Sequence, residues 1–352
     1  MKIAILNDTH CGIRNSSEIF LDNAEDFYTN VFFPECDKRN VKQIVHLGDY
    51  YDHRKFVNFK ALNHNRRVFL DQIRKRNMLM DIIPGNHDTY FKNTNELNSL
   101  KECLGHYMNE IHIVMEPTVM QYGSLSMGLL PWICADNYEQ SMNFIRDCKA
   151  DWLGSHLELN GFEFALGIKS THGMDAKLFS KFEQVLSGHF HTASQQGNIW
   201  YLGNPLEFFW SDAHDPKYFH ILDTETREVE KIRNNYTLFE KIVYNDKEMD
   251  YNNYSKNLSK KFVKVVVAEK TDPFTFDRFI DRIQNQDIYE LKIAENFNEF
   301  MGANVDDEDM SFEDTTEIVD SYIEAVDTDL DKDKIKIQMR ELMTEAQALE
   351  IA

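Results

Sequence analysis

Cysteine is sparse in this chain of 352 residues and follows no pattern. The sequence has no C-x-x-C pair, and its five cysteines are Cys11, Cys36, Cys103, Cys134 and Cys148. An odd number at irregular spacing excludes a disulfide framework and a cysteine-rich zinc site. We therefore expect five reduced thiols.

Long hydrophobic runs are also absent. No stretch approaches the roughly twenty consecutive apolar residues that a membrane-spanning helix requires. The first residues, MKIAILND, turn polar too early for a signal peptide. We therefore expect a cytoplasmic protein that has no membrane partner.

The chain has no overall excess of positive charge. Its formal net charge of -21 would argue against a nucleic-acid partner if the charge were evenly spread. Residues 303–352, however, hold 16 Asp and Glu against 4 Lys and Arg, a net charge of -12, and the first 302 residues carry only -9. Residues 52–77 even hold 8 basic against 2 acidic side chains. This segment predicts a local cationic surface.

Strand-like and helix-like segments alternate along residues 1–240. The first five read strand, helix, strand, helix, strand, at 2–8, 16–32, 41–49, 59–76 and 79–86. Closely spaced strand-like runs follow at 111–115, 120–133, 150–157, 162–170, 183–189, 197–204 and 217–223. This order predicts an α/β fold in which helices cover one sheet and a second, partly antiparallel sheet packs on the first.

The remaining chain predicts a smaller unit followed by a tail. The polar segment 245–261 has the composition of a linker. A strand, a helix and a strand are predicted after it, at 262–269, 271–285 and 289–295, with one apolar helix side formed by Phe276, Phe279, Ile280 and Ile283. We predict four parts, which are a main domain at 1–245, a small domain at 246–300, an acidic linker at 301–315 and a helical segment at 316–352.

The last segment carries one apolar seam. Its members recur with spacings of 4, 3, 4 and 3, and they are Ile335, Met339, Leu342, Ala346 and Leu349. Such a seam is typical of a helix that docks on another surface. That surface is either the chain's own domain or a partner protein.

Polar side chains follow several of the strand-like runs at the point where each run ends. The motifs are Asp8-Thr9-His10, Gly48-Asp49, Gly85-Asn86-His87-Asp88, Ser155-His156 and Gly188-His189-Phe190-His191. A single motif of this kind is more often an ordinary turn. Because the carboxyl ends of parallel strands border one crevice, five in this order predict that the donors meet.

The donor types indicate which ions they would hold. Aspartate, asparagine and histidine without thiolate suit Mn²⁺, with Mg²⁺, Fe²⁺ or Zn²⁺ as alternatives. Seven donors exceed what one ion needs beside substrate and water. They would serve two ions about 3.5–4 Å apart that share one carboxylate.

The order D-x-H, G-D-x-x-D, G-N-H-D, a single His and G-H-x-H resembles the calcineurin-like metallophosphoesterases over residues 1–225. The resemblance implies a two-sheet α-β-β-α sandwich. It also implies one metal held by Asp8, His10 and His191, a second held by Asn86, His156 and His189, and Asp49 as the bridge. His87 would be the general acid, helped by Asp88. We prefer His156 to His172 as the solitary histidine because it ends a hydrophobic run.

The segment GNIWYLGNPLEFFW (197–210) is similar to the Y-x-G-(S/N)-P strand of SbcD-type recombination nucleases, which include Mre-eleven-like proteins and bacteriophage members. The likeness, strongest to the bacteriophage members, implies a two-metal exonuclease or endonuclease for DNA repair and recombination, in the host cytoplasm if phage-encoded. Its substrates would be double-stranded DNA ends and DNA with single-stranded regions. Its partner would be an SbcC-type ATPase, in a heterotetramer that contains a homodimer of this chain. Residues 246–300 would cap the DNA, and the ATPase would bind Ile335, Met339, Leu342 and Leu349.

Four cationic residues are predicted to hold DNA phosphates in a sequence-blind way, namely Arg54, Lys55, Arg66 and Arg67. The alternative is a helix that shows solvated charge. The nuclease family often has a histidine where this chain has Asp52, which leaves open whether His53 takes the substrate-orienting role.

Two other functions fit parts of the pattern. A phosphomonoesterase or protein phosphatase would use the same two ions but would leave the domain after residue 245 without a role. A non-catalytic scaffold for an ATPase would be expected to have lost metal ligands, and this chain retains the full set.

Overall fold

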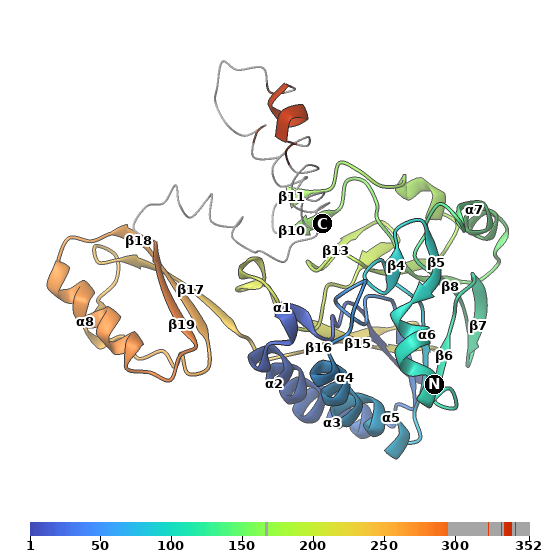
Figure 1. Ribbon diagram of the computed structural model, residues 1–352, viewed down its shortest axis with the longest axis horizontal. Coiled ribbons are helices and arrows are strands. Elements are labelled where there is room, and N and C mark those ends of the chain that lie inside the picture. Colours follow the sequence, from blue (N-terminus) through green and yellow to red (C-terminus); the bar gives the residue numbers. More distant parts are fainter. Residues whose placement is uncertain (166–167, 295–322, 324–331, 333, 340–341, 343–352) are drawn as a thin grey trace.

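Two six-stranded β-sheets lie face to face in the computed structural model, and helices cover their outer faces (Figure 1). The structure describes residues 1–165, 168–294, 323, 332, 334–339 and 342. The mixed α/β sandwich confirms the predicted fold class. Within the described residues, no helix is long and apolar enough to cross a membrane.

The first sheet has four parallel strands at its centre and edge, and two antiparallel strands complete it. In spatial order it consists of β16 (Val229–Arg233), β15 (Tyr218–Asp223), β1 (Lys2–Leu6), β2 (Gln43–His46), β3 (Leu79–Ile82) and β6 (Ile111–Ile113). Because β1, β2 and β3 are parallel neighbours, their carboxyl ends lie at one edge of the sheet.

Both faces of this sheet are buried. Successive side chains of a strand point to opposite faces, so Ile3 and Ile5 pack between the sheets, whereas Ala4 and Leu6 pack toward the helices. This double burial explains why the strands are apolar throughout and do not alternate.

Short helical segments cover the outer face of the first sheet. They are α1 (Ile13–Ser16), α2 (Glu18–Phe27), α3 (Phe33–Lys38), α4 (Phe59–Asn65) and α5 (Asp71–Lys75), with π-helical turns η1 (Tyr28–Phe32) and η2 (Arg66–Leu70). Aromatic rings from both groups meet in the core, where the Phe32 and Phe69 rings are 5.9 Å apart. The two predicted helices are therefore present, each interrupted by one π turn.

The second sheet is partly antiparallel, as predicted. Its order is β13 (Ser194–Gln196), β14 (Ile199–Tyr201), β12 (Gln184–Gly188), β9 (Trp152–His156), β8 (Leu125–Leu130) and β7 (Thr118–Tyr122). Strands β8, β9, β12 and β14 are parallel to one another, and the two edge strands are antiparallel to their neighbours. Its outer face packs against α7 (Tyr138–Asp147) and the 3-10 turn η4 (Ala176–Phe179).

Smaller elements fill the connections. They are the hairpins β4 (Thr89–Phe91) with β5 (Thr94–Asn98) and β10 (Glu163–Ala165) with β11 (Ile168–Lys169), the helix α6 (Ser99–Leu104), and the 3-10 turns η3 (Gly105–Tyr107), η5 (Trp210–Asp212) and η6 (Tyr251–Asn253). The first hairpin begins one residue after Asp88.

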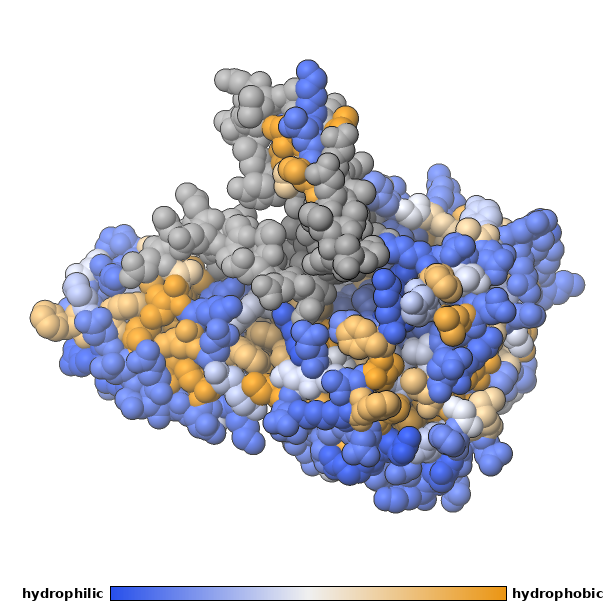
Figure 2. Space-filling view, viewed as in Figure 1, coloured by the Kyte–Doolittle hydropathy of each residue, from blue (hydrophilic) through white to orange (hydrophobic). Residues whose placement is uncertain are grey.

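A third, fully parallel sheet forms the smaller unit. Its strands are β17 (Phe239–Asn245), β18 (Phe262–Glu269) and β19 (Glu290–Ala294), and α8 (Pro273–Gln284) covers one face. The four apolar residues predicted for one side of α8 are buried there. The other face exposes Val243, and Figure 2 shows hydrophobic side chains gathered over this sheet.

Segment 245–261 differs from the predicted linker. It connects β17 and β18 within one sheet, and Tyr251 and Leu258 are buried. The boundary that we placed at residue 245 therefore follows a strand of the smaller sheet. Phe239 at the start of β17 packs in the main core, which joins the two units closely. The four-part division of the chain stays a prediction.

Part of the predicted C-terminal seam lies within the described residues. Residues 334–339 are helical, as expected for that segment. Ile335 and Met339 are half-buried, and Leu342 is exposed. Leu349 and the acidic linker at 301–315 lie outside the described part of the chain.

Candidate metal centre

Five strand ends deliver the seven predicted donors to one place. Strands β1, β2 and β3 come from the first sheet, and β9 and β12 come from the second. The structure brings all seven together, in overlapping groups that contain Asp8, His10, His191, Asp49, His156 and His189, with Asn86 bonded to the last two.

The first group lies beneath the end of β1. Nε2 of His10 is 3.1 Å from Nε2 of His191. Both oxygens of Asp8 accept the backbone N–H of His189, at 3.0 and 3.1 Å. Burial raises the pKa of Asp8 above its ordinary value. Asp8 also accepts a hydrogen bond from Nδ2 of Asn7. A buried carboxylate whose ionisation is opposed by burial favours a bound cation.

The second group lies where the two sheets meet. Oδ1 of Asn86 is 3.0 Å from Nε2 of His156 and 3.0 Å from Nδ1 of His189. The other ring nitrogen of His156 donates to the carbonyl of Leu47 at 2.8 Å, which directs Nε2 into the cluster.

Asp49 lies between the two groups. Its Oδ2 is 3.3 Å from Nε2 of His156 and 3.7 Å from Nε2 of His10. Burial opposes ionisation, but the surrounding imidazoles, above all His156, hold the pKa of Asp49 well below its ordinary value. This is the position that a bridging carboxylate requires.

The backbone around the donors is strained. Four of them have left-handed φ values, namely Asp8 (47°), His10 (40°), Asp49 (51°) and His189 (90°). Non-glycine residues rarely adopt this conformation, and it is concentrated at functional sites. A Cβ on Gly85 would lie 2.4 Å from the backbone nitrogen of Asp49, so only glycine permits this close approach.

The cluster fits two divalent cations. Nε2 of His10 and Nε2 of His191 face each other at 3.1 Å. Their lone pairs repel each other unless one of the two nitrogens carries a proton. The same applies to the two imidazoles that face the oxygen of Asn86. Cations placed between these atoms would accept the lone pairs and neutralise the buried carboxylates. The absence of sulfur ligands favours the harder ions.

His87 lies beside this cluster, half-buried. Its Nδ1 is 2.7 Å from the carbonyl oxygen of Asp52, and its backbone N–H donates to Oδ1 of Asp49 at 2.8 Å. Its ring meets the ring of His10 edge to face, with the centroids 4.8 Å apart. The structure therefore holds His87 at the rim of the predicted metal site.

Asp88 does not have the partner that we predicted. Its buried carboxylate accepts the backbone N–H groups of Tyr50, Tyr51 and Gly85 at 2.9–3.2 Å. These bonds tie the loop after β2 to the loop after β3. The side chain of His87 is instead oriented by the Asp52 carbonyl. These contacts give Asp88 a role in holding the loops, and the predicted assistance to His87 stays a prediction.

His172 and His156 differ clearly in their burial. His156 is fully buried within the cluster, whereas His172 is exposed in the loop after β11. The preference for His156, made because it ends an apolar run, agrees with this placement.

The predicted DNA-binding residues differ in their surroundings. Arg67 donates to both carboxylate oxygens of Glu25. This ion pair neutralises its charge. Arg66 and Lys55 are exposed, and Arg54 is half-buried. Figure 1 places α4, which precedes Arg66, on the outer helical layer.

His53 does not contact the cluster directly. Its ring stacks on the exposed Phe56 with the centroids 4.4 Å apart, and its Nε2 is 3.6 Å from Oδ2 of Asp52.

Two residues near the cluster were given no role in it by the sequence interpretation. Oδ1 of Asp52 is 3.2 Å from Nδ1 of His10. Although burial opposes protonation, this contact and the charge of Asp49 raise the pKa of His10 to about 9. Buried Lys217 is 3.3 Å from the carbonyl of His191 and forms ion pairs with Asp212 and Asp215. The contact of Asp52 with His10 and that of Lys217 with His191 join residues far apart in the sequence, and no local pattern signals such contacts.

Comparison with known proteins agrees with this geometry. Residues 1–193 match the family model described as calcineurin-like phosphoesterase. The chain belongs to this family. Its members are metal-dependent hydrolases, so the donor cluster is the expected place for the divalent ions of this phosphoesterase.

Two individual proteins are also similar. One is "Exonuclease subunit 1" of Enterobacteria phage T4, which is 29% identical over 351 residues, covering 98% of this chain and 99% of that protein. The other is a solved structure described as a novel archaeal phosphodiesterase. It is 17% identical, with a TM-score of 0.36, and the match covers 66% of this chain and all of that one.

Proposed function

We propose that this phosphoesterase is the nuclease subunit of a DNA-processing complex. The observation that supports this most is the convergence of seven donors from five strand ends into two adjoining groups. The near full-length similarity to a phage exonuclease subunit favours DNA over a small phosphomonoester as the substrate. The smaller unit at 239–294 is then available to contact DNA beside the site.

Each donor has a definite part in this proposal. One ion would be held by Asp8, His10 and His191. The other would be held by Asn86, His156 and His189, and Asp49 would contribute to both sites. Bound there, two divalent ions, for which Mn²⁺ is our first choice, supply Lewis-acid activation of a water molecule and of the phosphodiester.

His87 handles the proton that the leaving group needs. The Asp52 carbonyl can only accept a hydrogen bond, so Nδ1 of His87 carries the hydrogen and Nε2 faces the site. The water oxygen forms the new bond to phosphorus as the bond to the sugar oxygen breaks. Protonated Nε2 gives its proton to that oxygen.

A partner completes the proposal. The name of the T4 relative marks it as a subunit. We propose an SbcC-type ATPase as the partner, bound through the helix that contains Ile335, Met339 and Leu342, with two copies of this chain in the complex. Exposed Leu342 is the best-placed of these residues for an intermolecular contact.

The catalytic proposal is tested by hydrolysis assays in Mn²⁺. Wild type should cleave linear and hairpin DNA, and His87→Gln should lower the rate by about 10²–10⁴-fold without loss of metal. His172→Gln is the matched control because His172 is exposed and belongs to none of the donor groups. Turnover of a small aryl monophosphate far above that of DNA would identify a phosphomonoesterase instead. Unchanged DNA cleavage by His87→Gln would remove His87 from the mechanism.

The partner proposal is tested separately. Deletion of residues 305–352 should abolish complex formation with the ATPase subunit and leave metal-dependent cleavage by this chain intact. Leu342→Asp should weaken the complex, whereas Gln338→Asp, on the same exposed helix, should not. Tight complex formation by the deletion variant would contradict this assignment.

A further inference from the structure

Arg14 lies in an unusual left-handed turn just after His10. Gly12 has φ 95°, and Arg14, Asn15 and Ser16 have φ 53°, 54° and 59°. Side chains with a Cβ rarely adopt this conformation, and three in succession are rarer still. Such a backbone persists only where its surroundings hold it in place, and it is often found where a ligand is bound.

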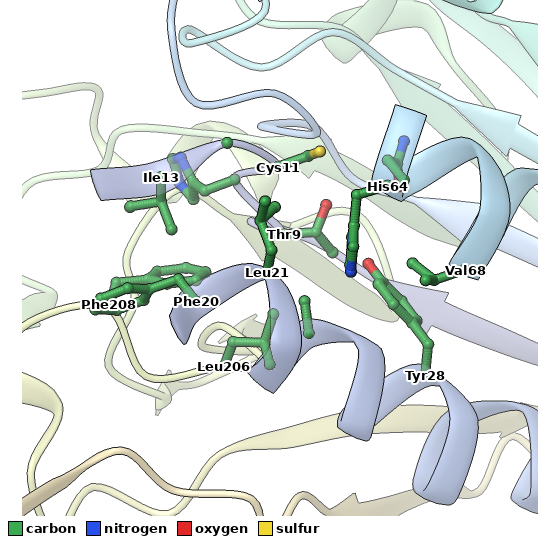
Figure 3. Close-up of a pocket in the computed structure, with 14 residues that line it drawn as sticks. Thr9, Cys11, Ile13, Phe20, Leu21, Tyr28, His64, Val68, Leu206 and Phe208 are labelled. Atoms are coloured by element: carbon green, nitrogen blue, oxygen red, sulfur yellow. The ribbon is translucent and has the colours of Figure 1, made fainter. Parts of the chain in front are cut away.

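The turn is anchored from below by apolar packing. Ile13 is 5% exposed and lies in the core with Phe20, Leu206 and Phe208. Figure 3 shows these side chains around a small cavity. The cavity volume is about 20 Å³, which leaves room for little more than one water molecule. Ile13 therefore fixes the turn, and the next residue, Arg14, is partly exposed.

The guanidinium of Arg14 is held in a fixed orientation. Its Nε donates to the carbonyl of Phe208 at 3.2 Å. Its central carbon lies 4.9 Å from the centre of the Phe209 ring, a cation–π distance. These two contacts set both the position and the plane of the charged group.

The same two phenylalanines contact the predicted metal ligands. The Phe208 ring is 5.5 Å from the ring of His10 and 5.8 Å from the ring of His191. The Phe209 ring is nearly parallel to that of His191, at 6.2 Å and 11°. Phe208 and Phe209 thus link the guanidinium to both imidazoles. The Phe209 ring therefore lies between the Arg14 guanidinium and the predicted metal ligand His191.

We propose that Arg14 binds a backbone phosphate of DNA next to the scissile phosphate. A guanidinium is permanently charged and can donate two parallel hydrogen bonds to phosphate oxygens. Its fixed plane lowers the entropy lost on binding. The contact carries no base information and sets the register of the strand relative to the ions. This inference rests on the proposed function because it requires a nucleic-acid substrate.

Substitutions can separate charge from backbone conformation. Arg14→Asn removes the guanidinium but keeps a residue that tolerates positive φ. Arg14→Lys keeps a charge but loses the planar pair of donors. Arg227→Asn is the matched control. Arg227 also has a positive φ, of 65°, and donates to a carbonyl, that of Thr224 at 2.6 Å, in the turn between β15 and β16.

The experiment compares DNA with a bis-aryl phosphodiester in Mn²⁺. Arg14→Asn should raise KM for DNA about 10-fold or more, a loss typical of one charge-assisted contact. The loss in kcat/KM should be at least fivefold larger for DNA than for the small diester. The slope of log affinity for DNA against log salt should fall by about 1. Arg14→Lys should recover part of the affinity, and Arg227→Asn should match wild type.

Two results would overturn the assignment. DNA cleavage by Arg14→Asn with wild-type KM and salt slope would show that the guanidinium does not bind phosphate. Equal losses on both substrates would show that Arg14 only supports the metal centre. The proposed function has its own control in the wild-type protein. If wild type hydrolysed the bis-aryl diester but not DNA, the proposed function would be wrong, whatever the Arg14 variants do.

Discussion

Oδ1 of Asp52 lies 3.2 Å from Nδ1 of His10, so this carboxylate fixes the orientation of a predicted metal ligand. Contacts of this kind raise the basicity of the ligand and restrain its ring. Asp52 thus has a defined place in the site, although it binds no ion in our assignment.

Asp52→Ala should therefore weaken metal binding. We expect Mn²⁺ affinity at the site that contains His10 to fall roughly 10–100-fold, measured by titration with isothermal calorimetry. Activity should recover in part at high Mn²⁺. Asp147→Ala, at an exposed carboxylate on α7, is the control. Unaltered Mn²⁺ affinity in Asp52→Ala would show that the contact does not matter for the ligand.

Asp88→Ala should destabilise the protein. The change leaves three buried backbone N–H groups without their acceptor. Each such group costs about 1–3 kcal/mol, so we expect a loss of roughly 3 kcal/mol or more in the free energy of unfolding, measured by urea denaturation. Asp88→Asn keeps one acceptor oxygen and should lose less. Equal stability of Asp88→Ala and wild type would argue against the loop-holding role.

Lys217→Met should also destabilise the fold. Lys217 is buried and pairs with Asp212 at 2.6 Å, and this carboxylate accepts the backbone N–H groups of Phe208 and Phe209. Removal of one partner from a buried ion pair typically costs about 3–5 kcal/mol. A thermal melt should show the loss, and Lys177→Met at an exposed position should not. An unchanged melting temperature would mean that the pair contributes little.

His220 should make the stability of the protein sensitive to acid. Burial lowers its pKa to about 3, and neither ring nitrogen has a hydrogen-bond partner in the described part of the chain. The unfolded chain takes up a proton near pH 6.5, whereas the folded chain does so only near 3. Stability is therefore lost as the pH falls between these values, by at most about 1.4 kcal/mol per pH unit.

His220→Phe should remove this contribution. Urea denaturation of the metal-free protein between pH 7 and 4 should give a shallower fall in unfolding free energy than wild type shows. His106→Phe, at an exposed position, should leave the slope as it is. A wild-type slope in His220→Phe would place the acid sensitivity elsewhere.

The sequence predicts the donor cluster because its signals are local. Each donor follows an apolar strand, several after a glycine, and parallel strands bring such ends to one edge. The role of Gly48 and Gly85 can also be predicted from the sequence, because a close approach of backbone at a tight turn requires glycine.

Other features depend on distant partners that no local pattern names. Arg67 forms an ion pair with Glu25 of another helical segment. The sequence alone predicted that this arginine would bind DNA. Strand β17 belongs to the smaller sheet because it pairs with β18, although a segment with the composition of a linker lies between the two strands in the sequence. The hairpin at 89–98 is polar, so no apolar alternation predicts it.

Anomalous diffraction from crystals grown with Mn²⁺ tests the central claim most directly. We predict two ions per chain about 3.5–4 Å apart, with Asp49 bound to both and Asn86 bound to one. A single ion, or two ions that Asp49 does not touch, would contradict the account.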